Sequence, residues 1–241
     1  MTHPKQYRFL LESPSASLHI IGAIYLLPSL LLYFVSEDLK FALLIDDLTF
    51  FESLRSIWFP SAAFLNEGGL FRPIVSTINL IDYSLWSTDA FGYHLTNALI
   101  HLINIQLVYH FSLRLFNRVD ISFLCSVIFL FHPILAHSVY WISGRTDMIA
   151  CSFYLISLIM ADKYLRNMDV KYFILSQVSF LAALLSKEIS VTLPLAQLWL
   201  ILYHRYSLDR AIILKQVITR FVAFSAFVVA LFLIYRLIIF D

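Results

Sequence analysis

The residues of this chain that could do chemistry are grouped in short charged motifs. Carboxylates take a proton from a hydroxyl group or bind a divalent cation such as Mg²⁺ or Mn²⁺. Arginine and lysine side chains bind phosphate groups. The combination predicts a site for a charged substrate, with a base beside phosphate-binding cations. The motifs are Asp46-Asp47, Phe71-Arg72-Pro73, Gly144-Arg145-Thr146-Asp147 and Ser186-Lys187-Glu188.

Each motif also has a structural explanation when it is taken alone. A helix dipole stabilises a preceding carboxylate by roughly 0.3–1 kcal/mol, which accounts for Asp46-Asp47 without a reaction. Arg72 precedes a proline and is held extended, where it can bind phosphate or pair with Asp82 or Glu67. Adjacent residues do not face each other on a helix, so Lys187-Glu188 should contact other groups. The functional interpretation therefore requires the motifs to meet at one place.

The elements that must position these motifs are membrane-spanning helices. Sixty per cent of the 241 residues are apolar, 14% are charged, and the mean hydropathy is +0.80. Several apolar runs reach the roughly 17–25 residues that a helix needs to cross a bilayer, and open sheet edges cannot be satisfied in lipid. We expect an all-α polytopic membrane protein, a single membrane domain over 1–241. The predicted transmembrane helices, about seven, are 18–35, 91–113, 121–141, 147–165, 171–185, 189–206 and 217–240.

The lysine and arginine residues predict the orientation. With the N-terminus in the cytoplasm, 11 of the 17 basic residues lie on the inner side, as the positive-inside rule requires. All four motifs and the long connection 36–90 then lie outside, in the periplasm, the extracellular space or the ER lumen, with a bacterial inner membrane preferred. The basic residues left outside are Lys40, Arg55, Arg72, Arg145, Lys187 and Arg236.

Further features of the sequence limit the function. No basic run predicts nucleic-acid binding. Cys125 and Cys151 lie inside apolar runs and are expected to be reduced. A basic lead precedes the first apolar run, and no small-residue cleavage site follows Val35, so we expect an uncleaved signal anchor. The partners predicted at this point are the lipid bilayer and a charged substrate.

The external connection 36–90 is predicted to carry two juxtamembrane helices. Thr49 and Glu52 have the spacing of a capping box, and apolar residues then recur at helical spacing until Pro60. This short helix should lie in the membrane interface. A second helix is expected over 73–86, beginning at a proline.

Polar groups inside two predicted spans point to a buried cavity or to helix packing. His94, Asn97, His101 and Asn104 fall on one helical face, which must contact other helices or a wet cavity. His94 lies nearest the external face and is the member expected to contact substrate. His132-Pro133 should kink the third span, with His132 and His137 on a cavity wall. Interhelical hydrogen bonds and a packing kink are the alternatives.

Taken in order, these motifs resemble the membrane domain of the transmembrane and tetratricopeptide-repeat O-mannosyltransferases, in the GT-C glycosyltransferase superfamily. The resemblance covers about residues 40–195. It rests on Phe71-Arg72-Pro73, Phe91-Gly92-Tyr93-His94-Leu95-Thr96-Asn97, His132-Pro133, Trp141-Ile142-Ser143-Gly144-Arg145-Thr146-Asp147, Ser186-Lys187-Glu188 and Val191-Thr192-Leu193-Pro194.

The resemblance implies a polyprenyl phosphate sugar as the donor, used on the external leaflet. Family catalysis relies on an acidic residue in the first external loop, which here corresponds to Asp46-Asp47. Inversion at the sugar carbon with one of these two carboxylates as base is the implied chemistry, and a metal ion is left open. The residues implied to line the lipid-phosphate site are Arg72, His132, Arg145 and Lys187.

The resemblance also implies more chain than is present. Members of the family carry roughly eleven or more spans, whereas this sequence ends at Asp241. Two hypotheses follow. The chain is an enzyme, alone or completed by a partner membrane subunit, or it is a non-catalytic subunit with a truncated GT-C scaffold that stabilises a larger complex. A transporter is a distant third alternative because no inverted repeat is visible.

Overall fold

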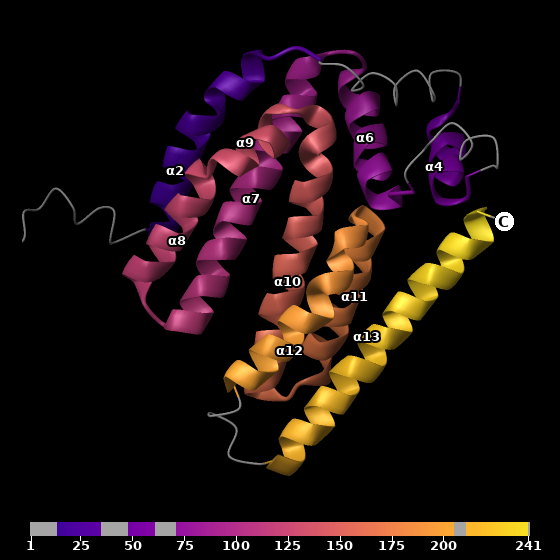
Figure 1. The fold of residues 1–241 in the computed structure, drawn as a ribbon. Coiled ribbons are helices and arrows are strands. Elements are labelled where there is room, and N and C mark those ends of the chain that lie inside the picture. Colours follow the sequence, from indigo (N-terminus) through magenta and orange to yellow (C-terminus); the bar gives the residue numbers. More distant parts are fainter. Residues whose placement is uncertain (1–13, 35–47, 61–70, 205–210, 241) are drawn as a thin grey trace, which may run out of the picture.

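The computed structural model describes residues 14–34, 48–60, 71–204 and 211–240, and every regular element there is a helix (Figure 1). In chain order the elements are α2 (Pro14–Leu26), η2 (Leu27–Leu31), α4 (Phe50–Trp58), α6 (Pro73–Trp86), α7 (Ala90–Phe116), α8 (Val119–Phe131), α9 (Pro133–Tyr140), η4 (Ile142–Gly144), α10 (Arg145–Asn167), α11 (Val170–Ser186), η5 (Glu188–Thr192), α12 (Leu193–His204) and α13 (Ala211–Phe240).

The long helices run up and down in one bundle, and α4 and α6 lie together at one end of it (Figure 1). We call this the α4–α6 end. The last helix, α13, crosses the side of the bundle and finishes near α4, where the Tyr235 hydroxyl donates to the Trp58 carbonyl at 2.6 Å. Segments that are far apart in the sequence therefore meet at the α4–α6 end.

The length and apolarity of the helices confirm an all-α polytopic membrane protein. Four helices can cross a membrane, namely Pro14–Leu31, Ala90–Phe116, Ile142–Asn167 and Lys215–Ile239, and the bent pair α8–α9 makes up to five. The predicted fifth and sixth spans form shorter helices. Helix α11 has 17 residues, and α12 has 12 and follows the 3-10 turn η5. In the part of the chain that the structure describes, four candidate spans, or five with the bent pair, therefore meet the length criterion, against about seven predicted.

The third predicted span is broken at His132-Pro133, as expected from the proline. Helix α8 ends at Phe131, α9 begins at Pro133, and the two axes differ by 59°. Proline has no N–H to continue the helical ladder. The His132 Nδ1 atom instead accepts from the Ile134 backbone N–H at 3.3 Å and so caps α9.

The two juxtamembrane helices form where they are predicted. Thr49 and Glu52 make the capping box that begins α4. Hydrogen bonds from the Thr49 side chain and backbone hold the pKa of the Glu52 carboxyl below its usual value. Helix α6 covers Pro73–Trp86, and Ile57 of α4 packs with its Leu80. The apolar face of α4 is thus turned toward α6.

The opposite end of the bundle is fixed by one buried carboxylate. Asp162 on α10 contacts Arg114 of α7 at 2.5 Å, Arg166 one turn further on α10 at 3.0 Å, and His204 of α12 at 2.8 Å. A charge without exposure to solvent is stable only when it is paired and hydrogen-bonded. The contacts of Asp162 join three helices there. Cys125 and Cys151 are free thiols, in agreement with the sequence analysis.

Candidate functional site

The two predicted catalytic carboxylates, Asp46 and Asp47, lie outside the described residues. The structure does describe Leu48 and the α4 helix that follows them, at the α4–α6 end. The role of either carboxylate as a base, or as a ligand of Mg²⁺ or Mn²⁺, stays a prediction.

Arg145, a predicted phosphate ligand, is fully buried at the start of α10. Its Nη1 atom donates to Asp82 at 2.5 Å and to Asn79 at 3.0 Å, and its Nη2 atom donates to the Tyr93 carbonyl at 3.0 Å. Asp82 is only 3% exposed and also accepts from the Thr96 hydroxyl at 2.7 Å. This buried network joins α6, α7 and α10. The charge of Arg145 is therefore balanced inside the protein.

Arg72 and Glu188, from motifs far apart in the sequence, form one cluster together with Arg236. Arg72 is the N-cap of α6, and its Nη2 atom lies 3.1 Å from Glu188 Oε2. Arg236 comes from the last turns of α13, and its Nη1 atom lies 3.6 Å from Glu188 Oε1. All three side chains are partly exposed, between 21% and 35%. The suggested pairing of Arg72 with Asp82 is thus wrong, because Asp82 pairs with Arg145.

A second ion pair joins Lys187, the residue before Glu188 in the sequence, to Asp147 in the first turn of α10. The Lys187 ammonium donates to Asp147 Oδ1, and both side chains are partly exposed. Lys187 and Glu188 thus have different partners, as the sequence analysis expected of neighbours. Each cation of the predicted site that the structure describes contacts a carboxylate. These cations are Arg72, Arg145 and Lys187.

The polar stripe of α7 is directed into the bundle and satisfies backbone groups of the broken span. The Asn97 amide donates to the Val139 and Trp141 carbonyls at 3.3 and 3.4 Å, where α9 ends. The His101 ring is hydrogen-bonded to the Leu130 backbone just before the break. Carbonyls at helix ends have no partner in their own helix. The interhelical interpretation of the stripe therefore holds for these two residues.

The remaining stripe members lie on the same buried face. Asn104 donates to the Met148 carbonyl at 2.8 Å and accepts from Ser152 at 2.7 Å. His94, the predicted substrate contact, is 1% exposed inside the bundle. The contact of His94 with a substrate stays a prediction.

Replacing Asn97 with leucine is expected to destabilise the protein by about 1–2 kcal/mol, because two carbonyls at the end of α9 lose their donor. The measurement is unfolding of the purified protein in mixed micelles. Leu99→Ala, on an exposed position of the same helix, is the control and should change stability less. Equal effects of the two variants would contradict the capping role of Asn97.

The two histidines of the broken span lie on the surface of the described bundle. His132 is exposed and caps α9, and His137 is exposed and packs edge-on against Trp141 with the ring centroids 4.8 Å apart. A role at a phosphate site stays a prediction for both histidines.

Two charged residues of this region were missed as site members. Asp82 was named only as a pairing option for Arg72, although a carboxylate in an apolar juxtamembrane helix requires a cation. Arg236 was counted among the external basic residues and then left aside. The sequence did indicate a role for it, because an arginine among the apolar residues near the end of a membrane-spanning helix must reach the interface or an acidic partner.

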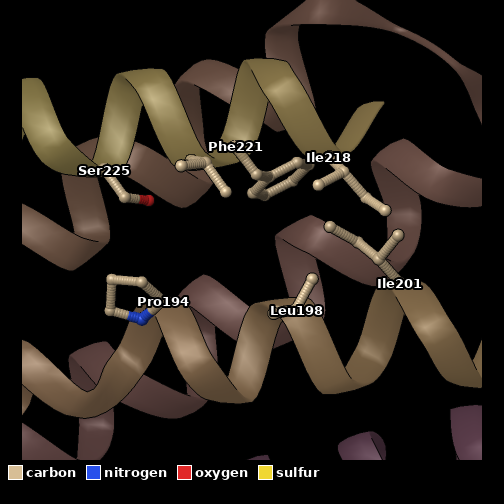
Figure 2. Close-up of a pocket in the computed structure, with 7 residues that line it drawn as sticks. Pro194, Leu198, Ile201, Ile218, Phe221 and Ser225 are labelled. Atoms are coloured by element: carbon tan, nitrogen blue, oxygen red, sulfur yellow. The ribbon is translucent and has the colours of Figure 1, made fainter. Parts of the chain in front are cut away.

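The described residues contain no group of three or more histidine, cysteine, aspartate or glutamate side chains that could hold a metal ion. A cavity of about 20 Å³ lies between α12 and α13, lined by Pro194, Leu198 and Phe221 among others, with the Ser225 hydroxyl at one side (Figure 2). That volume holds about one water molecule. It is too small for a sugar, so this cavity is a packing gap between the two helices.

The chain is similar to proteins named as O-mannosyl-transferases. F38B6.6 of Caenorhabditis elegans is 29% identical over 146 residues, which are 59% of this chain and 20% of that protein. Tmtc1 of Drosophila melanogaster is 26% identical over 164 residues, 66% of this chain and 19% of that protein. TMTC2 of Mus musculus is 30% identical over 94 residues, 39% of this chain and 11% of that protein. No family model and no solved structure matches the chain.

The fold defines the class as a polytopic helical membrane protein, and the chain is similar to proteins named as O-mannosyl-transferases. More particularly, the expected resemblance to the transmembrane and tetratricopeptide-repeat O-mannosyltransferases is confirmed, at modest identity over part of the chain. The chain spans about a fifth of the length of the first two relatives. All three come from animals and give no support to a bacterial membrane.

Proposed function

We propose that this chain is a GT-C type glycosyltransferase, or the part of one that binds the donor. It would transfer a sugar, mannose by analogy with the relatives, from a polyprenyl phosphate to an acceptor hydroxyl at the α4–α6 end. The observation that carries the proposal is the meeting of Arg72, Glu188 and Arg236 there, from α6, η5 and α13. Cations that gather from separate segments of a membrane protein are typical of an anionic ligand site.

The reaction would be an inverting displacement at the anomeric carbon. Asp46 or Asp47 removes the proton of the acceptor hydroxyl, whose oxygen forms the new bond to that carbon. The bond from the anomeric carbon to the phosphate oxygen breaks, and polyprenyl phosphate leaves with the electron pair. Arg72 and Lys187 would stabilise the charge on the leaving phosphate. A divalent cation bound by Asp46 or Asp47 stays open, because neither residue lies in the described part of the chain.

The proposal includes an orientation. The N-terminus would be cytoplasmic, and the α4–α6 end would face the ER lumen or the cell exterior. This follows from the excess of basic residues in the segments at the other end of the bundle, such as Arg114, Arg118 and Arg166.

The alternative is a non-catalytic subunit that stabilises a larger membrane complex. The observation that favours it is the pairing of the described cations with carboxylates, above all the burial of Arg145 against Asp82. Buried ionic networks also occur as purely structural features. A partner membrane chain would then cover the lipid-facing side of α13, and it should copurify in a stoichiometric amount.

Sugar transfer by the full chain tests the proposal. The assay uses a labelled polyprenyl phosphate mannose and a serine- or threonine-containing peptide in lipid nanodiscs. Wild-type protein should transfer label, and Arg72→Gln should lower kcat/KM about 10- to 100-fold, the loss of about 1.5–3 kcal/mol from one charge-assisted hydrogen bond. Arg118→Gln, an exposed arginine at the opposite end, should leave transfer unchanged. Absence of transfer by wild type with every donor favours the subunit.

A further inference from the structure

We infer that the end of the bundle opposite α4 and α6 binds the head group of an anionic phospholipid, whose phosphate contacts Arg114 and Arg166. A pocket of about 470 Å³ lies there, within the range of roughly 300–1,000 Å³ that is usual for ligand pockets. This site takes a lipid that is not consumed, so it goes beyond the proposed function and does not depend on it. We call it the Arg114–Arg166 pocket, and its lining residues are Leu113, Arg114, Leu115, Asn117 and Arg166.

Two guanidinium groups share one carboxylate beside this pocket. Arg114 at the end of α7 donates from Nε to Asp162 at 2.5 Å, and Arg166 at the end of α10 donates from Nε to the same carboxylate at 3.0 Å. His204 also contacts Asp162, at 2.8 Å. Within the described residues, Asp162 is the only acidic partner of either arginine. The two guanidinium groups therefore carry one more positive charge than their shared carboxylate neutralises.

Both arginines keep N–H groups that a ligand can use. In the part of the chain that the structure describes, Arg114 donates only from Nε, and Arg166 donates from Nε and Nη2 but not from Nη1. Their side chains are 28% and 44% exposed, so a ligand can reach them from the pocket. Guanidinium groups match the oxygens of phosphate and form strong, charge-assisted hydrogen bonds with them.

Backbone carbonyls that would repel an anion at this place already have donors. The last carbonyls of a helix carry partial negative charge and lack partners in their own helix. At the end of α7, the Arg114 carbonyl accepts from Arg166 Nη2 at 2.7 Å. The next carbonyl, that of Leu115, accepts from the Tyr203 hydroxyl at 3.0 Å. These bonds offset the negative end of the α7 dipole where the pocket lies.

Aromatic side chains of α12 place the pocket at the level of the lipid head groups. Tyr203, which bonds the Leu115 carbonyl, is 45% exposed and stacks on the exposed Trp199 with the ring centroids 5.6 Å apart. Exposed tryptophan and tyrosine residues gather where helices leave the hydrocarbon region. Lipid phosphates lie at this level, so a lipid is already held where its phosphate can bind. In the proposed orientation this end meets the cytoplasmic leaflet, which carries anionic lipids.

Lipid binding by the full chain in phosphatidylcholine nanodiscs tests the inference. The probe is phosphatidic acid with a fluorescent acyl chain, and phosphatidylcholine with the same label is the neutral comparison. Arg166→Gln should lower the affinity for phosphatidic acid about tenfold, since one charge-assisted hydrogen bond corresponds to roughly that factor. Asn117→Asp places a carboxylate at the pocket and should also lower it about tenfold, through repulsion of the phosphate. Aspartate tolerates the left-handed backbone of this residue, whose φ is 52°, so the second variant should keep the fold.

Arg118→Gln is the matched control, because it removes the same charge from an exposed arginine that does not line the pocket. It should bind phosphatidic acid like wild type. Equal losses in Arg118→Gln and Arg166→Gln would show a diffuse attraction to basic residues and would overturn the inference, as would binding that neither pocket variant changes. Equal affinity for phosphatidylcholine, or displacement of the probe by an equal concentration of soluble glycerol phosphate, overturns the assigned ligand. None of these outcomes bears on sugar transfer at the α4–α6 end.

Discussion

Replacing Asp82 with leucine is expected to destabilise the folded protein by about 3–5 kcal/mol, the usual cost of leaving a buried charge without its partner. Arg145 is 0% exposed and Asp82 only 3% exposed, so water cannot take over the role of the lost carboxylate. Thr96 loses its acceptor in the same change. A loss of this size is a large part of the stability of most domains.

A double variant separates the charge effect from a general loss of packing. Asp82→Leu/Arg145→Met removes both charges and should recover a large part of the stability lost by Asp82→Leu, because apolar pairs replace buried ion pairs at little cost. Asp120→Asn, in the exposed pair with Arg118, is the control and should leave the unfolding midpoint nearly unchanged. Unfolding in mixed micelles measures all three. A small effect of Asp82→Leu, similar to that of Asp120→Asn, would contradict the structural role of the network.

The sequence predicted the features that depend on a few neighbouring residues. The capping box of Thr49 and Glu52, the start of α6 at Pro73 and the break at Pro133 all appear at the expected positions. Each follows from a local rule, either a side chain that bonds the backbone three residues away or a missing N–H. The apolar composition likewise predicted the fold class, because every backbone N–H and C=O group inside a bilayer must be hydrogen-bonded within the protein, as it is in a helix.

The sequence could not predict which charges pair, because pairing depends on contacts between distant segments. Arg72 had candidate carboxylates on its own helix and loop, but its partner Glu188 lies 116 residues further on. Arg236 joins the same cluster only because α13 turns back to α4. Within the described residues, four or five candidate spans meet the length criterion against about seven predicted, because α11 and α12 are shorter than the apolar runs suggested.

The ion pairs limit which of these residues can bind a ligand under either proposed role. Arg145 cannot bind a ligand without leaving Asp82 unpaired in the protein interior, so its contribution to any donor site would be to hold α6, α7 and α10 together. Glu188 and Arg72 are partly exposed, and their separation would cost far less.

Replacing Asp46 or Asp47 with asparagine is expected to lower sugar transfer by about 10²- to 10⁴-fold, the usual contribution of a general base. Asparagine keeps the size and hydrogen-bonding capacity of the side chain but cannot accept the proton of the acceptor hydroxyl. Both single variants are needed, because adjacent residues of an extended segment point in opposite directions and only one should face the substrate. Expression and the affinity for the polyprenyl phosphate should stay at the wild-type level, which separates a lost base from a lost donor site. Full transfer activity in both variants would exclude these carboxylates as the base and leave the scaffold subunit as the better account of the chain.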